Sequence, residues 1–148
     1  AHLSGSKLHY NHGRSTLHGG FLEGFASPGD GVSWDFATSN PGTYRVTLEY
    51  ALSEGPEGGA FGVDVSGSEP LTAEARATAR WEGPLLEVKT NTPGKGEAND
   101  NRWTFRRHEI GIATLSPAGE KHLEVRAMTV KHGNLFYLKS VVLEPLRP

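Results

Sequence analysis

The segment DGVSWDFATSNPGTYRVTLEYAL, residues 30–52, constrains the fold of this chain more than any other segment. Val32, Trp34 and Phe36 alternate with polar residues, and the alternation resumes in YRVTLEY. A period of two sends alternate side chains to opposite faces, so each half predicts a strand with one buried face. The sequence SNPGT between them supplies a proline with a fixed φ and a glycine that accepts positive φ. The segment therefore predicts a β-hairpin.

The same alternation recurs along most of the chain. We expect WTFRRHEIGIATL and KHLEVRAMTV to form a second strand pair, joined by the turn SPAGE. The doubled apolar positions of NLFYLKSVVLEPL predict a long final strand that is buried on both faces or carries a bulge. Further strands are expected in AFGVDVSG, LTAEARAT and HLSGSKLHY.

Composition agrees with an all-β fold. The 148 residues fit a single domain over 1–148, without cysteine and therefore without a disulfide framework. Nineteen glycines and nine prolines are spread along the chain, which is typical of many short strands and tight turns. The best helix candidate, TAEARATAR, alternates too regularly to favour a helix. Eight to ten short strands predict an antiparallel β-sandwich of jelly-roll type.

Charge and hydropathy exclude some partners. The formal net charge of −2 gives no reason to expect nucleic acid or an anionic membrane as the main partner. No apolar run approaches the ~18 residues of a membrane span. The N-terminus AHLSGSKLHY lacks a charged-then-apolar signal segment and an initiator methionine. We expect the chain to be a mature or excised piece of something longer.

Three motifs carry a family resemblance that covers most of the chain from residue 24 to residue 146. They are DGVSWDFATSNPGTYRVTLEYA, then RWTFRRHEIGIATLSPAGEKHLEVRA, then HGNLFYLKSVVLEPL. In order and spacing they resemble the signatures of galactose-binding-like β-sandwich domains. These include carbohydrate-binding modules of families six and thirty-five and the accessory domains of α-L-fucosidases and related glycoside hydrolases. The resemblance implies a non-catalytic module that holds a glycan and sits outside the cell or in the periplasm.

The resemblance also implies a sugar site at one end of the sandwich. Trp103 matches the aromatic residue that opens the later strand, and Asn134 matches the asparagine before the last strand. Phe25 stands where the family usually has a tyrosine. Flat aromatic faces pack against the C–H patches of sugar rings, and amides supply paired donors and acceptors to hydroxyls. The alternatives are a core-capping Trp103, a turn role for Asn134 and a buried Phe25.

Other residues could border the same site. Trp81 and Tyr137 could flank a sugar or cover an edge of the sandwich. Arg102, Arg106 and Arg107 surround Trp103, and a cationic rim would favour an acidic or sulfated polysaccharide. The alternative is a solvated face whose charge is balanced by nearby acids. These acids are Glu97, Asp100 and Glu109.

Metal sites have weaker support in the sequence. Family members often hold a structural calcium between the first and last strands, but here the first strand has no acid and the last offers only Glu144. Loop carboxylates could contribute ligands, namely Asp30, Glu97 and Asp100. Histidines gather in HYNHGRSTLH, yet no carboxylate or cysteine completes a known spacing.

The motifs of catalysis are missing from the sequence. It contains neither a cysteine nucleophile, nor a Gly-x-Ser-x-Gly elbow, nor a phosphate loop. We therefore expect a non-enzymatic module attached to a polysaccharide-degrading enzyme. Two other hypotheses remain: a structural accessory domain that packs against a catalytic domain, and a small β-sandwich enzyme.

Overall fold

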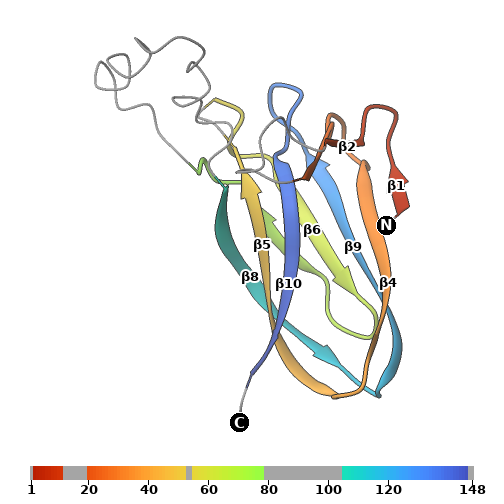
Figure 1. Cartoon of the computed structure of the whole chain (residues 1–148). Coiled ribbons are helices and arrows are strands. Elements are labelled where there is room, and N and C mark those ends of the chain that lie inside the picture. The colour runs from red at the N-terminus through yellow and green to blue at the C-terminus, as the bar shows by residue number, and fades with distance from the viewer. Residues whose placement is uncertain (1, 12–19, 53–54, 79–104, 147–148) are drawn as a thin grey trace.

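The computed structural model describes residues 2–11, 20–52, 55–78 and 105–146. Ten strands form in these residues, and they build the two facing layers shown in Figure 1. The all-β sandwich expected from the sequence is therefore confirmed. Their bounds are β1 His2–Ser4, β2 His9–Asn11, β3 Phe21–Glu23, β4 Gly31–Thr38, β5 Gly42–Ala51, β6 Ala60–Val65, β7 Leu71–Glu74, β8 Phe105–Leu115, β9 Gly119–Thr129 and β10 Tyr137–Pro145.

Each layer is a five-stranded antiparallel sheet. Sheet A has the order β1-β4-β9-β6-β7, and sheet B has the order β2-β3-β10-β5-β8. Strands β3, β5, β7 and β9 all end at the same end of the sandwich, which we call the loop end. This end is at the top of Figure 1.

The expected hairpin in residues 30–52 is wrong in its pairing. Both strands form, but β4 pairs with β9 in sheet A while β5 pairs with β10 and β8 in sheet B. The two strands therefore lie in opposite sheets of the sandwich. Strands β8 and β9, expected to pair, lie in different sheets in the same way. Alternation shows which side chains of a strand are buried, but it does not show which strand is the hydrogen-bonded neighbour. The pattern is the same whether the next strand joins the same sheet or the opposite sheet.

Two local expectations have mixed outcomes, and one strand was not expected. A register shift between Leu138 and Ser140 confirms a bulge in the last strand. The strand expected over 71–78 ends at Glu74, because the following residues leave sheet A for the loop end. There Thr78 donates its backbone N–H to the Leu52 carbonyl at 2.8 Å. Strand β3 was missed, because three residues are too few to show a period.

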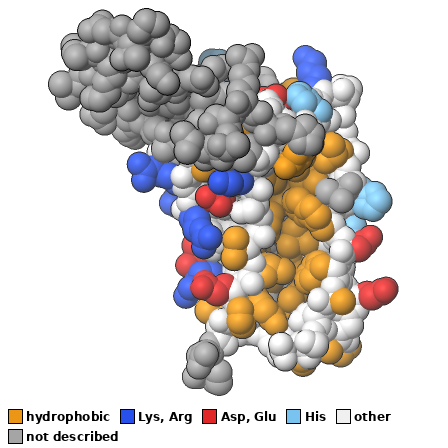
Figure 2. Space-filling view, in the orientation of Figure 1, with side chains coloured by type: hydrophobic (Ala, Val, Ile, Leu, Met, Phe, Trp, Pro, Cys, Tyr) orange, Lys and Arg blue, Asp and Glu red, His pale blue; other side chains and the backbone are white. Residues whose placement is uncertain are grey.

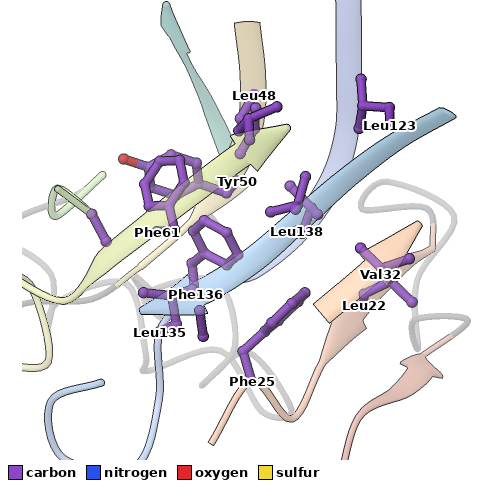
Figure 3. Close-up of a cluster of buried hydrophobic side chains, with 14 of the residues drawn as sticks. Leu22, Phe25, Val32, Leu48, Tyr50, Phe61, Leu123, Leu135, Phe136 and Leu138 are labelled. Carbon is purple, nitrogen blue, oxygen red and sulfur yellow. The ribbon is translucent and has the colours of Figure 1, made fainter. Parts of the chain in front are cut away.

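The core lies between the sheets and is richest in aromatic rings near the loop end. Phe136 packs against Tyr50, Phe61 and Phe25 with ring centroids 4.9, 5.1 and 5.2 Å apart. All four rings are at most 1% exposed. Figure 3 shows them converging from β5, β6 and the segments that precede β4 and β10. The loop end is therefore supported by a closely packed aromatic core.

Candidate functional site

The sequence predicts six sugar-binding residues at one end of the sandwich, and the structure describes three of them. Asn134 and Tyr137 come from the segment between β9 and β10 and from the start of β10, and Phe25 comes from the segment before β4. Three of the predictions, Trp81, Arg102 and Trp103, lie outside the described residues. Their role in a site stays a prediction.

Asn134 ends a tight turn that is held on both sides. Lys131 and Asn134 form a bridge, with the Asn134 N–H donating to the Lys131 carbonyl at 3.2 Å. His132 and Gly133 between them have φ of 53° and 69°. Two positive φ values are characteristic of a two-residue type I′ turn. Asn134 itself has no positive φ, so the turn does not need asparagine for its backbone freedom.

The side chain of Asn134 is available for binding. Directly after it, Leu135 donates its N–H to the Phe25 carbonyl at 2.9 Å, and the Leu135 side chain is fully buried. The turn before it and this anchor after it fix the position of Asn134. Its amide makes no hydrogen bond within the described part of the chain. A half-buried amide with free donors and acceptors on a fixed backbone suits recognition of hydroxyl groups.

Phe25 belongs to the core. Its side chain is 0% exposed, and its ring meets Phe136 edge to face at 87°. A sugar platform needs an open aromatic face, which Phe25 does not offer in this structure. Phe25 is therefore not part of the proposed site.

Tyr137 belongs to an aromatic cluster on the outer face of sheet B. Tyr137 and Phe105 both stand opposite Ala51, on strands either side of β5. Phe21 packs against both, with ring centroids 5.7 Å from Tyr137 and 5.6 Å from Phe105. The ammonium group of Lys139 lies 5.3 Å from the centre of the Phe105 ring. We define these four residues as the aromatic cluster, of which sequence reasoning found only Tyr137.

The arginines of β8 do not share one face. Arg106 and Arg107 are consecutive in a strand, so their side chains point to opposite faces. The Nε of Arg106 donates to the Thr78 carbonyl, whereas Arg107 is exposed and stands opposite Glu49 of β5. Within the described residues the expected cationic rim is therefore divided. An acidic ligand stays a prediction.

The carboxylates named for calcium already have protein partners. Oδ2 of Asp30 accepts hydrogen bonds from the backbone N–H groups of Ala26 and Ser27, both at 3.0 Å. Glu144 pairs with Arg45 at 2.9 Å. Glu97 and Asp100 lie outside the described residues. Across the described ranges, no group of three or more His, Cys, Asp or Glu side chains could hold a metal ion.

A hollow of about 580 Å³ lies on sheet A, toward the end opposite the loops. Nδ1 of His122 lies 2.8 Å from the Asp35 carboxylate there. The nearby Ser66 hydroxyl contacts the backbone of His122 and not its ring: it accepts from the N–H at 2.7 Å and donates to the carbonyl at 3.1 Å. A serine bonded in this way is not activated by the imidazole, so these residues do not form a nucleophile–base pair.

Comparison with solved structures identifies the fold. A family 6 module from Cellvibrio mixtus lichenase 5A, solved with cellotriose, matches 97% of this chain and 91% of its own chain, with a TM-score of 0.63 and 17% identity. A family 35 module named Xyl-CBM35, solved with a disaccharide containing glucuronic acid, matches 100% and 92%, with a TM-score of 0.63 and 16% identity. The chain has the β-sandwich fold of carbohydrate-binding modules.

The same module fold also occurs as a part of larger proteins. Bacillus thuringiensis Cry4Aa toxin matches 99% of this chain with a TM-score of 0.67 and 12% identity. This chain spans only 22–25% of the length of Cry4Aa and of a Podospora anserina GH26-CBM35 mannanase. No protein-family model and no curated protein matched the sequence.

Among the described residues, no helix is long and apolar enough to cross a membrane.

Proposed function

We propose that this chain is a non-catalytic carbohydrate-binding module that targets an attached polysaccharide-degrading enzyme to its glycan. The observation that carries the proposal is the agreement of the fold, over nearly its full length, with modules that hold oligosaccharides. Targeting raises the local concentration of an enzyme on its substrate. Such a module works outside the cell or in the periplasm, where polysaccharides are found.

The proposed site is the loop end, with Asn134 at its centre. The Asn134 amide offers hydrogen bonds to sugar hydroxyls, and Tyr137 lies three residues further along the chain. Trp103 would supply the stacking face, with Trp81 and Arg102 beside it; these three roles come from the sequence alone. Binding is expected to be weak, because sugar hydroxyls exchange bonds with water for bonds with protein.

A glycan screen tests this proposal. The wild-type chain is titrated with neutral, acidic and sulfated polysaccharides, beside Asn134→Ala and Trp103→Ala. The matched control is Asn40→Ala, since Asn40 is an exposed asparagine in the turn at the opposite end. We expect one glycan class to bind, the two loop-end variants to lose at least tenfold in affinity, and the control to bind normally. Loss of binding at high salt would support an acidic ligand. Absence of binding to every class would contradict the proposal.

One observation favours a second candidate function, that of an accessory domain docked on a catalytic domain. Along one side of the sandwich, β10 pairs with β3 only at Leu138, and β1 pairs with β4 only as far as Ser33. Half-buried side chains line the remaining lengths of these strands. They are Trp34 and Phe36 from β4 and Val141 and Leu143 from β10. Figure 2 shows the resulting hydrophobic strip.

An exposed apolar strip of this kind is typical of a surface that another domain covers. This candidate expects the screen above to find no ligand. It also expects the backbone amides of β10 to exchange more slowly with solvent when the chain is part of a longer polypeptide. Equal exchange rates in the isolated chain and in the longer polypeptide would count against it.

A further inference from the structure

Beneath the loop end, Tyr50 and His108 form a buried polar pair. The Tyr50 hydroxyl lies 2.8 Å from Nδ1 of His108, and the two residues are 1% and 9% exposed. Phe61 and Phe136 pack around the Tyr50 ring, with centroids 6.2 and 4.9 Å away. Polar groups in such surroundings are costly unless they are hydrogen-bonded, so the bonds of this pair are tightly constrained.

The direction of each hydrogen bond follows from a third partner. The backbone N–H of Arg76 donates to the Tyr50 oxygen at 3.0 Å. The Tyr50 hydroxyl proton is then free to point at Nδ1 of His108, which can accept it only when unprotonated. The network thus assigns a neutral His108 with its proton on Nε2. Burial, and then the positive charge of Arg76, lower the pKa of His108, in agreement with this assignment.

The bond from Arg76 fastens the segment 75–78 to the end of the sandwich. Thr78 is held further along by Leu52, whose N–H donates to the Thr78 hydroxyl oxygen at 3.0 Å. Arg106 also donates to the Thr78 carbonyl. Of these attachments, only the bond between Arg76 and Tyr50 depends on a side chain that is bonded to a titratable imidazole.

Among the residues that the structure describes, few charged groups lie against His108. The ionisable groups that interact with the imidazole are Tyr50 of β5 and Arg76 of the segment after β7. Arg106 lies two residues before His108 in β8. Strand β6 contributes the Phe61 ring, 6.4 Å from the imidazole. Burial raises the pKa of Tyr50, so the phenol stays neutral and His108 is the group of this pair that gains a proton as the pH falls.

We propose that Tyr50 and His108 form an acid-sensitive latch that holds the segment 75–78 on the loop end. A proton on Nδ1 removes the acceptor of the Tyr50 hydroxyl and presents a second donor to an oxygen that already accepts from Arg76. It also places an imidazolium near the Arg76 charge. The latch does not depend on glycan binding.

The pH range of the latch follows from linkage. The closed form has a lowered His108 pKa. For the released form we expect the ordinary imidazole pKa of about 6.5. The released form therefore binds more protons. Above pH 6.5 the latch has its full strength. It weakens as the pH falls from about 6.5 to the pKa of the buried imidazole, and below that value it weakens no further.

Hydrogen exchange of the Arg76 amide tests the latch. After correction for intrinsic exchange, we expect its protection to fall below about pH 6.5, by up to about tenfold per pH unit. The fall should follow the titration of the His108 ring, measured by NMR in the same samples. The Val125 amide, in the middle of β9, serves as the internal control and should stay protected.

Two variants separate the latch from simple packing. His108→Gln keeps an acceptor near the Tyr50 hydroxyl but cannot titrate, so Arg76 protection should no longer change with pH. Tyr50→Phe keeps the ring but removes the acceptor of the Arg76 N–H, so protection should be low at every pH. Unchanged wild-type protection between pH 8 and pH 4.5 would overturn the proposal, and so would a pH response that persists in His108→Gln. If a variant fails to fold, agreement of the two wild-type titrations decides the question.

Discussion

At the scale of single residues, Asp35 and His122 show how an exposed pair sets a protonation state. Their hydrogen bond of 2.8 Å is the largest cause that lowers the pKa of Asp35 below 3.8. The bond is present in the folded chain, so it stabilises the fold above pH 3.8, and this contribution is lost as the pH falls through the lower, folded-state pKa. Both side chains are largely exposed, so the effect on stability is small.

We predict that His122→Ala raises the pKa of Asp35 toward 3.8. The measurement is an NMR titration of the Asp35 carboxyl carbon. His132→Ala is the control, because His132 lies in the turn at the loop end, away from Asp35. An Asp35 pKa that is the same in wild type and His122→Ala would show that the bond is not the cause of the shift.

Phe136 is the residue on which the core below the loop end depends most. Its ring is fully buried against three other aromatic rings. We predict that Phe136→Ala lowers the free energy of unfolding by about 3–5 kcal/mol, measured by urea denaturation. Phe36→Ala removes the same group from a half-buried position and should cost less. Equal losses for the two variants would contradict this account of the core.

Sequence reasoning at this scale worked where a backbone signal existed. HGN correctly indicated a turn, and Asn134 does end one. Phe25 follows no period, since it lies in a loop, so nothing in the sequence distinguished a buried ring from an exposed one. Phe21 and Phe105 were missed as neighbours of Tyr137 because their cluster depends on the order of strands in sheet B.

At the scale of elements, the turn 131–134 positions the only candidate amide that the structure describes. A residue with positive φ costs about 1–2 kcal/mol when it has a Cβ. Gly133 has φ of 69°, and a Cβ there would meet no atom within 4 Å. The cost of filling this position is therefore conformational.

We predict that Gly133→Ala destabilises the chain by about 1 kcal/mol, while His132→Gly leaves stability unchanged or raises it. Thermal unfolding of both variants beside wild type is the measurement. Gly133→Ala should also weaken glycan binding if Asn134 must be held in place. A Gly133→Ala chain as stable as wild type would mean that the turn does not keep this conformation.

The strands themselves were largely predictable, and their partners were not. Alternation located β4, β5, β6, β8, β9 and β10 within a few residues. It could not tell a hairpin from two consecutive strands in opposite sheets, because each strand buries one face in both arrangements. Strand β7 ends early because Arg76 bonds to Tyr50 of β5 and Thr78 bonds to Leu52, just after β5. These long-range contacts have no local signal.

At the scale of the whole molecule, the fold brings together, at the loop end, segments that are distant in the sequence. The family resemblance predicted this architecture, since three ordered motifs determine a sandwich more firmly than any one of them. The ligand does not follow from the fold. Solved structures that are 12–17% identical to this chain and share its fold include modules with bound sugars and a toxin. The proposed function therefore depends on the side chains of the loop end, whose role stays a prediction.

The measurement that tests the central claim most directly is NMR mapping of backbone amides during titration with an oligosaccharide. Cellotriose and a disaccharide containing glucuronic acid are the first two probes. We predict shifts in residues 131–137 at the loop end, which Asn134→Ala abolishes while the β9 amides keep their wild-type positions. Shifts confined to the hollow around Asp35 and His122, or no shifts with any glycan, would contradict the account.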